Sequence, residues 1–315
     1  MSVAGSEAAR DGGTSRITTL LAAIAERHPL HKPFLDRALA YLTAGEVERL
    51  DLILAYLLEK GRALAYVVDC YMTVLEDMTS EQMYFFRHGE YRHKTYAEVA
   101  DSVYDNPDYM DRYMYGLALT AFLWPNHVEI ARFFERTLPI GRRGRYLEVG
   151  PGHGYFMAIA ATRGAFDELV GIDISEASIA QTRAMLERFA PKAAARADLR
   201  VGDFHAATEL EPESFDAAVM GEVIEHVEDA PGFLRRLHEL VRDDAYVCVT
   251  TGINAPAIDH LYLWRTTDDL EAMIAECGFG IRESLHLPYE GRTLEQSRKQ
   301  KLPIRVAYVL EKASA

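Results

Sequence analysis

Cysteine is scarce in this chain of 315 residues, which contains only Cys70, Cys248 and Cys277. The three cysteines are odd in number and far apart in the sequence, so they match neither a disulfide framework nor a paired CxxC metal motif. Thiols of this kind are typical of a reducing compartment. We therefore expect a cytoplasmic protein.

Long apolar runs are missing as well. No stretch approaches the roughly 18 uncharged apolar residues that a membrane-spanning helix needs. The first residues include Glu7 and Asp11, and the apolar stretch after them is interrupted by Glu26, Arg27 and His28. We therefore expect neither a signal peptide nor a membrane anchor, and no membrane partner.

Basic residues are in the minority. The chain has 34 Lys and Arg against 48 Asp and Glu, which gives a formal net charge of −14. A nucleic-acid-binding protein usually neutralises phosphates with Lys and Arg, so a polynucleotide partner is disfavoured, although a local basic patch is still compatible with this charge. The length exceeds one ordinary domain of about 100–200 residues, which predicts a core domain and a sizeable second module.

The N-terminal part of the chain has helical periodicity. Residues 1–16 are small and polar, and we expect a disordered tail there. Between residues 17 and 140 apolar side chains recur at spacings of three and four, as in Leu50, Ile53 and Leu57. Strong strand signals are missing, so this region is predicted to be an all-helical domain. Aromatic residues concentrate in its second half and could cover a bound substrate.

From residue 141 to 315 short apolar runs alternate with amphipathic helical segments such as Glu176–Phe189 and Pro231–Val241. The predicted strands are Arg145–Val149, Leu169–Ile172, Leu199–Val201, Ala217–Met220, Ala245–Thr250, Ile281–His286 and Ile304–Leu310. Such alternation is typical of a mostly parallel sheet with helices on both faces. A polar loop is expected between the last two strands.

A glycine-rich loop follows the first predicted strand. Its sequence is Gly150-Pro151-Gly152-His153-Gly154, and a helical pattern begins directly after it. Glycines permit positive φ and let a ligand approach the main chain closely. The spacing is GxGxG, whereas phosphate-binding dinucleotide sites have GxGxxG, so the loop suits a ligand without phosphates.

Acidic residues stand at the ends of the next two predicted strands. Asp173, followed by Ile174, is placed where a carboxylate accepts hydrogen bonds from both ribose hydroxyls. Asp203 ends the third strand and can accept from an adenine amino group, while Phe204 packs on the ring. Three successive strand ends therefore favour one nucleoside ligand.

In order and spacing, the loop, Asp173, Asp203 and the segment 215–220 resemble the class I S-adenosylmethionine-dependent methyltransferases. The resemblance covers roughly residue 145 to the C-terminus. It implies an α/β fold, a Rossmann-like seven-stranded mostly parallel sheet with helices on both faces, beside the N-terminal helical domain, and S-adenosyl-L-methionine as cofactor. The cofactor-binding residues that it implies are Glu148, Gly150, Gly152, His153, Gly154, Asp173, Ile174, Asp203, Phe204, Gly221 and Glu222.

A cluster of acids and a histidine follows the fourth predicted strand. In a helical turn, Glu222, Glu225 and His226 would share one face. The segment resembles the Glu-x-x-Glu-His motif of ubiquinone-pathway O-methyltransferases and small-RNA 2′-O-methyltransferases, some of which hold a divalent cation there. In the RNA enzymes another histidine follows the fifth strand, and His260 is in a comparable place. The resemblance implies Glu222, Glu225, His226 and His260 as ligands of Mg²⁺, Mn²⁺ or Fe²⁺.

Two metal-free interpretations stay open at this point. In one, Glu222 closes the cofactor site, and His226, with Glu225 beside it, is the catalytic base. In the other, the cluster only packs.

The sequence thus predicts an S-adenosylmethionine-dependent methyltransferase of specialised metabolism whose partner is a small-molecule acceptor. Methylation of an oxygen, assisted by a divalent metal or by the His226 base, is the favoured reaction. The alternatives are C- or N-methylation without metal, RNA 2′-O-methylation, against which the net charge of −14 argues, and a catalytically silent protein that keeps the pocket for assembly. A homo-oligomer is compatible with the sequence.

Overall fold

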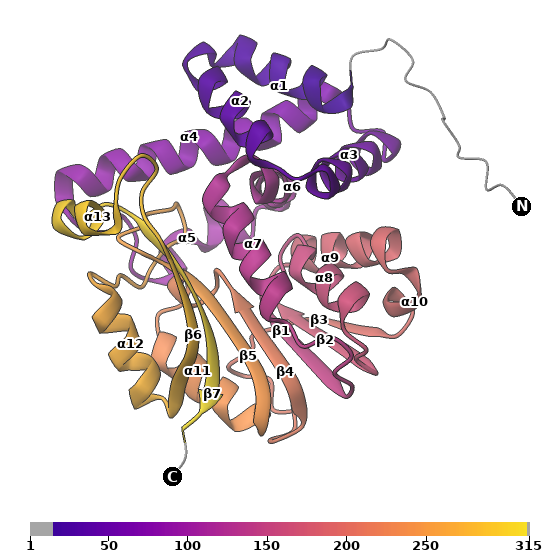
Figure 1. Cartoon of the computed structure of the whole chain (residues 1–315), viewed down its shortest axis with the longest axis vertical. Coiled ribbons are helices and arrows are strands. Elements are labelled where there is room, and N and C mark those ends of the chain that lie inside the picture. Colours follow the sequence, from indigo (N-terminus) through magenta and orange to yellow (C-terminus); the bar gives the residue numbers. More distant parts are fainter. Residues whose placement is uncertain (1–14, 314–315) are drawn as a thin grey trace, which may run out of the picture. The chain divides into compact units, whose positions relative to one another are not determined.

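The computed structural model (Figure 1) describes residues 15–313. These residues divide into two compact units between Val68 and Asp69. Most of the predicted tail, 1–16, lies outside the described residues. The division falls earlier in the chain than residue 140, because the helices after Val68 cluster with the sheet. A functional division at residue 140 stays a prediction from the sequence.

The first unit is helical. It contains α1 (Arg16–Arg27), the 3-10 turn η1 (Pro29–His31), α2 (Lys32–Tyr41), α3 (Ala44–Glu59) and the first residues of α4 (Leu64–His88). A capping box begins α3, where Thr43 Oγ1 accepts from the Glu46 amide and the Glu46 carboxylate accepts from the Thr43 amide. Buried leucine and isoleucine side chains join α1 to α3.

The second unit begins with helices. These are the rest of α4, α5 (Tyr96–Val99), the π-helical turn η2 (Ala100–Tyr104), α6 (Pro107–Leu123) and α7 (Pro125–Thr137). Asn106 caps α6 by accepting from the Tyr109 amide, and a proline occupies the first position of both α6 and α7. Within the described residues, no helix has the length and apolar character needed to cross a membrane.

A seven-stranded sheet forms the core of the second unit, in the order β3-β2-β1-β4-β5-β7-β6. The strands are β1 (Arg145–Val149), β2 (Glu168–Asp173), β3 (Ala197–Val201), β4 (Phe215–Gly221), β5 (Val241–Ile253), β6 (Phe279–Leu287) and β7 (Ile304–Lys312). The five neighbouring strands β3, β2, β1, β4 and β5 are parallel to one another. Strand β7 runs antiparallel to both of its neighbours, β5 and β6. The predicted α/β fold is confirmed.

Six further helices pack with the sheet. They are α8 (Tyr155–Arg163), α9 (Glu176–Phe189), α10 (Pro191–Ala194), α11 (Ala230–Leu240), α12 (Thr267–Glu276) and α13 (Leu294–Gln300). Leu234 and Leu237 of α11 and Ile274 of α12 are buried against apolar residues of the sheet. The loop predicted between the last two strands contains α13, which starts at a capping box of Thr293 and Gln296.

Strand register places the candidate site. Val149 at the end of β1 pairs with Ile172 of β2 and with Met220 of β4. Since these strands are parallel, the residues that follow them emerge at one edge of the sheet. The glycine loop, Asp173 and Gly221 therefore meet there.

Candidate active site

A cavity of about 250 Å³ lies at this edge of the sheet, within the second unit. Its walls come from the glycine loop, the ends of β2, β3 and β4, the helices α4, α6 and α7, and the loop after β5. Apart from Gly154 and Glu225, every residue predicted for cofactor or metal binding lines it.

The three glycines of the loop have different roles. All have positive φ, 63° at Gly150, 54° at Gly152 and 78° at Gly154. Gly150 and Gly152 line the cavity, and a Cβ on Gly150 would lie 2.6 Å from Val223 Cγ2. A Cβ on Gly154 would lie 2.7 Å from the Cα atom of Thr182 in α9. Gly154 therefore permits close packing of α8 on α9, and it is not part of the cavity wall.

Asp173 is held at the cavity by main-chain donors. Its Oδ2 accepts from the Gly152 amide at 3.2 Å, and its Oδ1 accepts from the Ser175 amide at 2.9 Å. Burial raises the pKa of Asp173 to about 6, although these two amides oppose the shift. Each carboxylate oxygen retains a lone pair for a ligand hydroxyl. Ile174 is exposed beside it.

An apolar wall stands at the end of β3. Phe204 is buried, and its ring centroid lies 5.4 Å from that of Phe233 in α11. Asp203 Oδ1 accepts from the His205 amide at 2.9 Å, which closes an Asx turn. Phe233 and Val227 also line the cavity, although the sequence analysis did not single them out.

Glu148, His153 and Gly221, three more of the predicted cofactor-binding residues, each have close neighbours around the cavity. Glu148 is buried at the cavity wall and accepts from the Tyr146 hydroxyl at 2.5 Å; burial raises the pKa of Glu148 to about 8. His153 Nδ1 accepts from the Tyr155 amide at 3.2 Å. Gly221 follows β4, and a Cβ there would lie 2.6 Å from the Phe156 ring.

The acidic cluster has a different geometry from the one predicted. The helical turn is a short 3-10 turn, η3, that begins only at Ile224 and ends at His226. Glu222 precedes it with a φ of 55°, in the left-handed region. Glu222 therefore lies outside the turn and does not share a helical face with Glu225 and His226.

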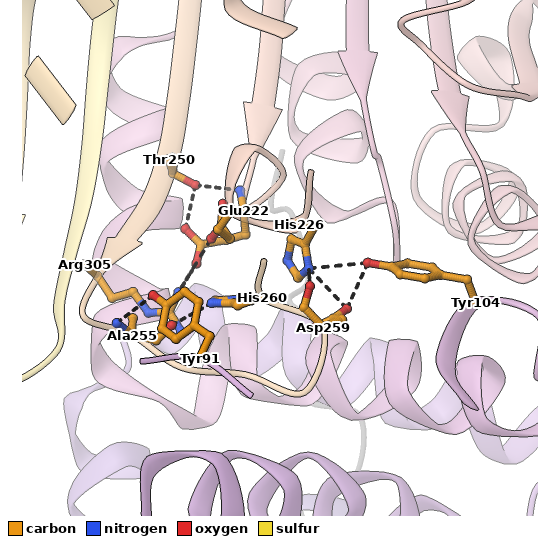
Figure 2. Close-up of polar contacts among 10 residues, drawn as sticks. Tyr91, Tyr104, Glu222, His226, Thr250, Ala255, Asp259, His260 and Arg305 are labelled. Atoms are coloured by element: carbon orange, nitrogen blue, oxygen red, sulfur yellow. Dashed lines mark hydrogen bonds and ion pairs between the residues drawn. The ribbon is translucent and has the colours of Figure 1, made fainter. Parts of the chain in front are cut away.

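Glu222 is engaged by neighbours on β5 and β7 (Figure 2). Its carboxylate accepts from Thr250 Oγ1 at 2.9 Å and forms an ion pair with Arg305 Nη1. The same Nη1 atom lies 4.0 Å from Glu225 Oε1. Arg305 is a pocket residue that sequence reasoning missed, because its strand resembles any other buried strand.

His226 is oriented by Asp259 (Figure 2). Its Nδ1 lies 3.1 Å from Asp259 Oδ2, and the Tyr104 hydroxyl donates to the same oxygen at 3.1 Å. Burial alone would lower the pKa of His226, but attraction and hydrogen bonding to Asp259 outweigh it and raise the pKa to about 9. Burial would raise the pKa of Asp259, but attraction and hydrogen bonding to His226 outweigh burial and lower this pKa to about 2. Asp259 and Tyr104 were not predicted as site residues.

The structure brings Glu225, His226 and His260 together, with one ligand atom of each within 4.8 Å of the others. Glu225 is fully buried, and neither carboxylate oxygen has a hydrogen-bond partner in the described chain. Burial is the main reason that the pKa of Glu225 rises to about 7. His260 Nδ1 lies 2.6 Å from the Ala255 carbonyl oxygen.

This arrangement fits a divalent cation. Histidines that bind metals usually donate the other ring N–H to a carboxylate or a carbonyl, as His226 does to Asp259 and His260 does to Ala255. The buried Glu225 carboxylate, which has no hydrogen-bond partner in the described chain, completes the set. Glu222, the fourth predicted ligand, lies outside this group because Arg305 and Thr250 hold its carboxylate.

The part of the cavity away from the sheet is apolar. Its residues come from α4, α6 and the turn before α7, and they include Met78, Met110, Tyr113, Met114 and Trp124. Methionine and aromatic side chains adapt to flat or irregular apolar ligands.

Comparisons with known proteins agree with this architecture. The model of a methyltransferase-domain family matches residues 126–282. The mitomycin 7-O-methyltransferase MmcR is 15% identical, with coverage of 75% of this chain and 68% of that chain and a TM-score of 0.52. A Haemonchus contortus phosphoethanolamine N-methyltransferase, solved with S-adenosylhomocysteine, is 16% identical, with coverage of 69% and 59% and a TM-score of 0.50. No curated protein sequence matches the chain.

These structures resemble the chain in fold alone. The methyltransferase activity follows from the match to the family model. The cavity fits the cofactor of such enzymes, because Gly150 and Gly152 leave the loop open where side chains would project. Asp173 offers carboxylate oxygens in the same cavity. Residues 126–282 therefore belong to a family of methyltransferase domains, and the chain is a methyltransferase whose fold is that of the class I S-adenosylmethionine-dependent enzymes.

Proposed function

We propose that this methyltransferase transfers a methyl group to a hydroxyl of a small, largely apolar molecule. The observation that carries the proposal is the buried Glu225 carboxylate, which has no hydrogen-bond partner in the described chain and lies against His226 and His260. Methylation of an oxygen needs removal of a proton, whereas methylation of a free amine needs less from the protein.

The cavity supports a small acceptor. One continuous space of about 250 Å³ extends from the glycine loop to His226 and to the apolar residues of α6. A small molecule can be enclosed in such a space, which lets the protein exclude water from the reaction.

The cofactor would be held by residues already described. Asp173 would accept from the ribose hydroxyls, and Phe204 and Phe233 would enclose the adenine. Gly150 and Gly152 would lie against the remainder of the molecule. The bound cofactor supplies a methyl group on a positively charged sulfur that is ready to leave.

In the proposed reaction, the acceptor oxygen attacks this methyl group, a C–O bond forms and the methyl–sulfur bond breaks. The hydroxyl proton passes to the Glu225 carboxylate, because Asp259 keeps the neighbouring His226 protonated and fixes the orientation of its imidazole. In the alternative form of the reaction, a divalent cation held by Glu225, His226 and His260 would take the place of this base and lower the pKa of the hydroxyl.

The proposal is tested with S-adenosylmethionine that carries a radioactive methyl group, incubated with a small-metabolite extract and, separately, with RNA. We expect label in metabolites, on an oxygen identified by mass spectrometry and NMR. Glu225→Gln should lower the transfer at least about 100-fold without weakening S-adenosylhomocysteine binding. The exposed Glu276→Gln is the matched control. Label in RNA alone, or on nitrogen or carbon, would contradict the proposal.

A further inference from the structure

Two tyrosines of one segment contact the loop that follows β5. The segment, residues 89–104, lies between α4 and α6, includes α5 and η2, and carries Tyr91 and Tyr104 (Figure 2). The loop, residues 254–262, carries His260. The two tyrosine hydroxyls form hydrogen bonds with two different residues of this loop. One segment therefore holds the loop at two points.

The Tyr91 hydroxyl fixes the residue that orients His260. It accepts from the Ala255 amide at 3.2 Å. The carbonyl oxygen of the same Ala255 lies 2.6 Å from His260 Nδ1, and because a carbonyl oxygen can only accept, Nδ1 carries a ring hydrogen. The rings of Tyr91 and His260 also meet edge to face, with centroids 5.7 Å apart. Tyr91 therefore supports both the ring of His260 and the hydrogen bond that orients it.

The Tyr104 hydroxyl fixes the residue that orients His226. It donates to Asp259 Oδ2 at 3.1 Å, and the same oxygen lies 3.1 Å from His226 Nδ1. The main-chain carbonyl oxygen of Asp259 lies 3.2 Å from this nitrogen as well, so Nδ1 carries a ring hydrogen. The other carboxylate oxygen of Asp259, Oδ1, has no hydrogen-bond partner among the described residues. Tyr104 is therefore a second anchor, beside His226, for a carboxylate that is held through one oxygen.

The same loop also sets the position of Glu225. The amides of Leu261 and Tyr262 donate to the main-chain carbonyl of Glu225 at 2.8 and 3.0 Å. The rings of His226 and His260 are perpendicular to each other, with centroids 4.6 Å apart. A shift of the loop would therefore change the distances among the carboxylate and both imidazoles at once.

We propose that Tyr91 and Tyr104 are positioning residues for the methyl transfer, because each hydroxyl holds the loop residue that orients one histidine, His260 for Tyr91 and His226 for Tyr104. The inference rests on the proposed function, in which Glu225, beside these two histidines, takes the proton of the acceptor. The segment between α4 and α6 thereby contributes to the chemistry as well as to the wall of the cavity.

The test removes each hydroxyl and leaves the ring in place. Tyr91→Phe and Tyr104→Phe should each lower the transfer of labelled methyl groups to the small-metabolite extract about tenfold, the lower end of the effect of a residue that orients an active-site histidine. The affinity for S-adenosylhomocysteine, measured by calorimetry, should stay unchanged, which also shows that both variants fold. Tyr96→Phe is the matched control, because Tyr96 lies in the same segment and stacks on Tyr104 but is exposed. It should change neither value.

NMR of isotope-labelled imidazoles, recorded with S-adenosylhomocysteine and a chelator, separates positioning from a general structural effect. Tyr91→Phe should shift the Nδ1 signal of His260 and leave that of His226 in place, and Tyr104→Phe should do the reverse. Unchanged transfer in both variants, equal shifts of both signals, or a parallel loss of S-adenosylhomocysteine binding would overturn the proposal. Label on nitrogen or carbon in the wild type would instead contradict the proposed function, and selective shifts would then still show that each tyrosine orients its own histidine.

Discussion

The Nδ1 atom of His226 lies 3.1 Å from the carboxylate of Asp259, and the two residues come from different loops at the same edge of the sheet. The Tyr104 hydroxyl donates to that carboxylate from a third element, η2 (Figure 2). The imidazole is therefore fixed by tertiary structure, through contacts of its Nδ1 atom.

Replacement of Asp259 by Asn should lower the pKa of His226 from about 9 toward its ordinary value of 6.5, because the attracting charge is lost. The raised pKa of His226 also determines how the stability of the fold changes with pH. A histidine with a raised folded-state pKa stabilises the fold below pH 6.5, and this contribution is lost as the pH rises through about 9.

The pKa of His226 can be followed by NMR titration of labelled imidazoles in the presence of a chelator. Thermal unfolding of the wild type should lose stability between about pH 7 and pH 10, and Asp259→Asn should lose less over the same interval. Identical slopes for the two proteins would show that the pair is not ionised as described.

Cofactor binding should depend on pH through Asp173. The pKa of this carboxyl group is raised to about 6, so the ionised form that accepts two ribose hydroxyls becomes dominant only above that pH. The affinity for S-adenosylhomocysteine, measured by calorimetry, should rise between about pH 5 and pH 7.5. Asp173→Asn should bind at least about tenfold more weakly. A mutant with the wild-type pH dependence would refute the assignment of this transition to Asp173.

Gly154 and Gly141 form a matched pair for stability. Both have positive φ, 78° and 76°, but only at Gly154 would a Cβ meet a neighbouring backbone atom. Gly141→Ala should cost about 1–2 kcal/mol of unfolding free energy from backbone strain. Gly154→Ala should cost about 3 kcal/mol or more, because α8 must also move away from α9. Urea denaturation measures both values, and equal costs would argue against the close packing of the two helices.

The proposed cation site can be examined with Mn²⁺ by electron paramagnetic resonance. Glu225→Gln and His260→Ala should each weaken Mn²⁺ binding at least about tenfold, because each removes a direct ligand. Glu222→Gln should have a smaller effect, since Arg305 and Thr250 already hold that carboxylate. A loss in Glu222→Gln as large as that in Glu225→Gln would make Glu222 a ligand after all.

Much of the fold could be predicted from local patterns. Apolar residues recur every second position in strands and every third or fourth position in helices, and this difference distinguishes the two kinds of element. The helix Glu176–Phe189 has the bounds that the sequence predicts. The α13 helix was missed although Thr293 and Gln296 provide a local capping signal. β5 begins earlier than predicted because Val241 pairs with Phe215 across an irregularity in the register.

The site was less accessible to such reasoning. The glycines and Asp173 belong to one local motif, so their meeting could be predicted from strand ends. Tyr104 and Arg305 reach the cavity from distant segments through tertiary packing, which no local pattern reveals. The left-handed φ of Glu222 is equally invisible in the sequence, since glutamate rarely adopts it.

A crystal structure with S-adenosylhomocysteine bound tests the central claim most directly. We predict that the ribose contacts Asp173, that the adenine lies against Phe204, and that the sulfur faces Glu225 and His226 across a space for the acceptor. Cofactor bound in the cavity with its sulfur directed away from Glu225 and His226, or bound outside the cavity, would contradict this account.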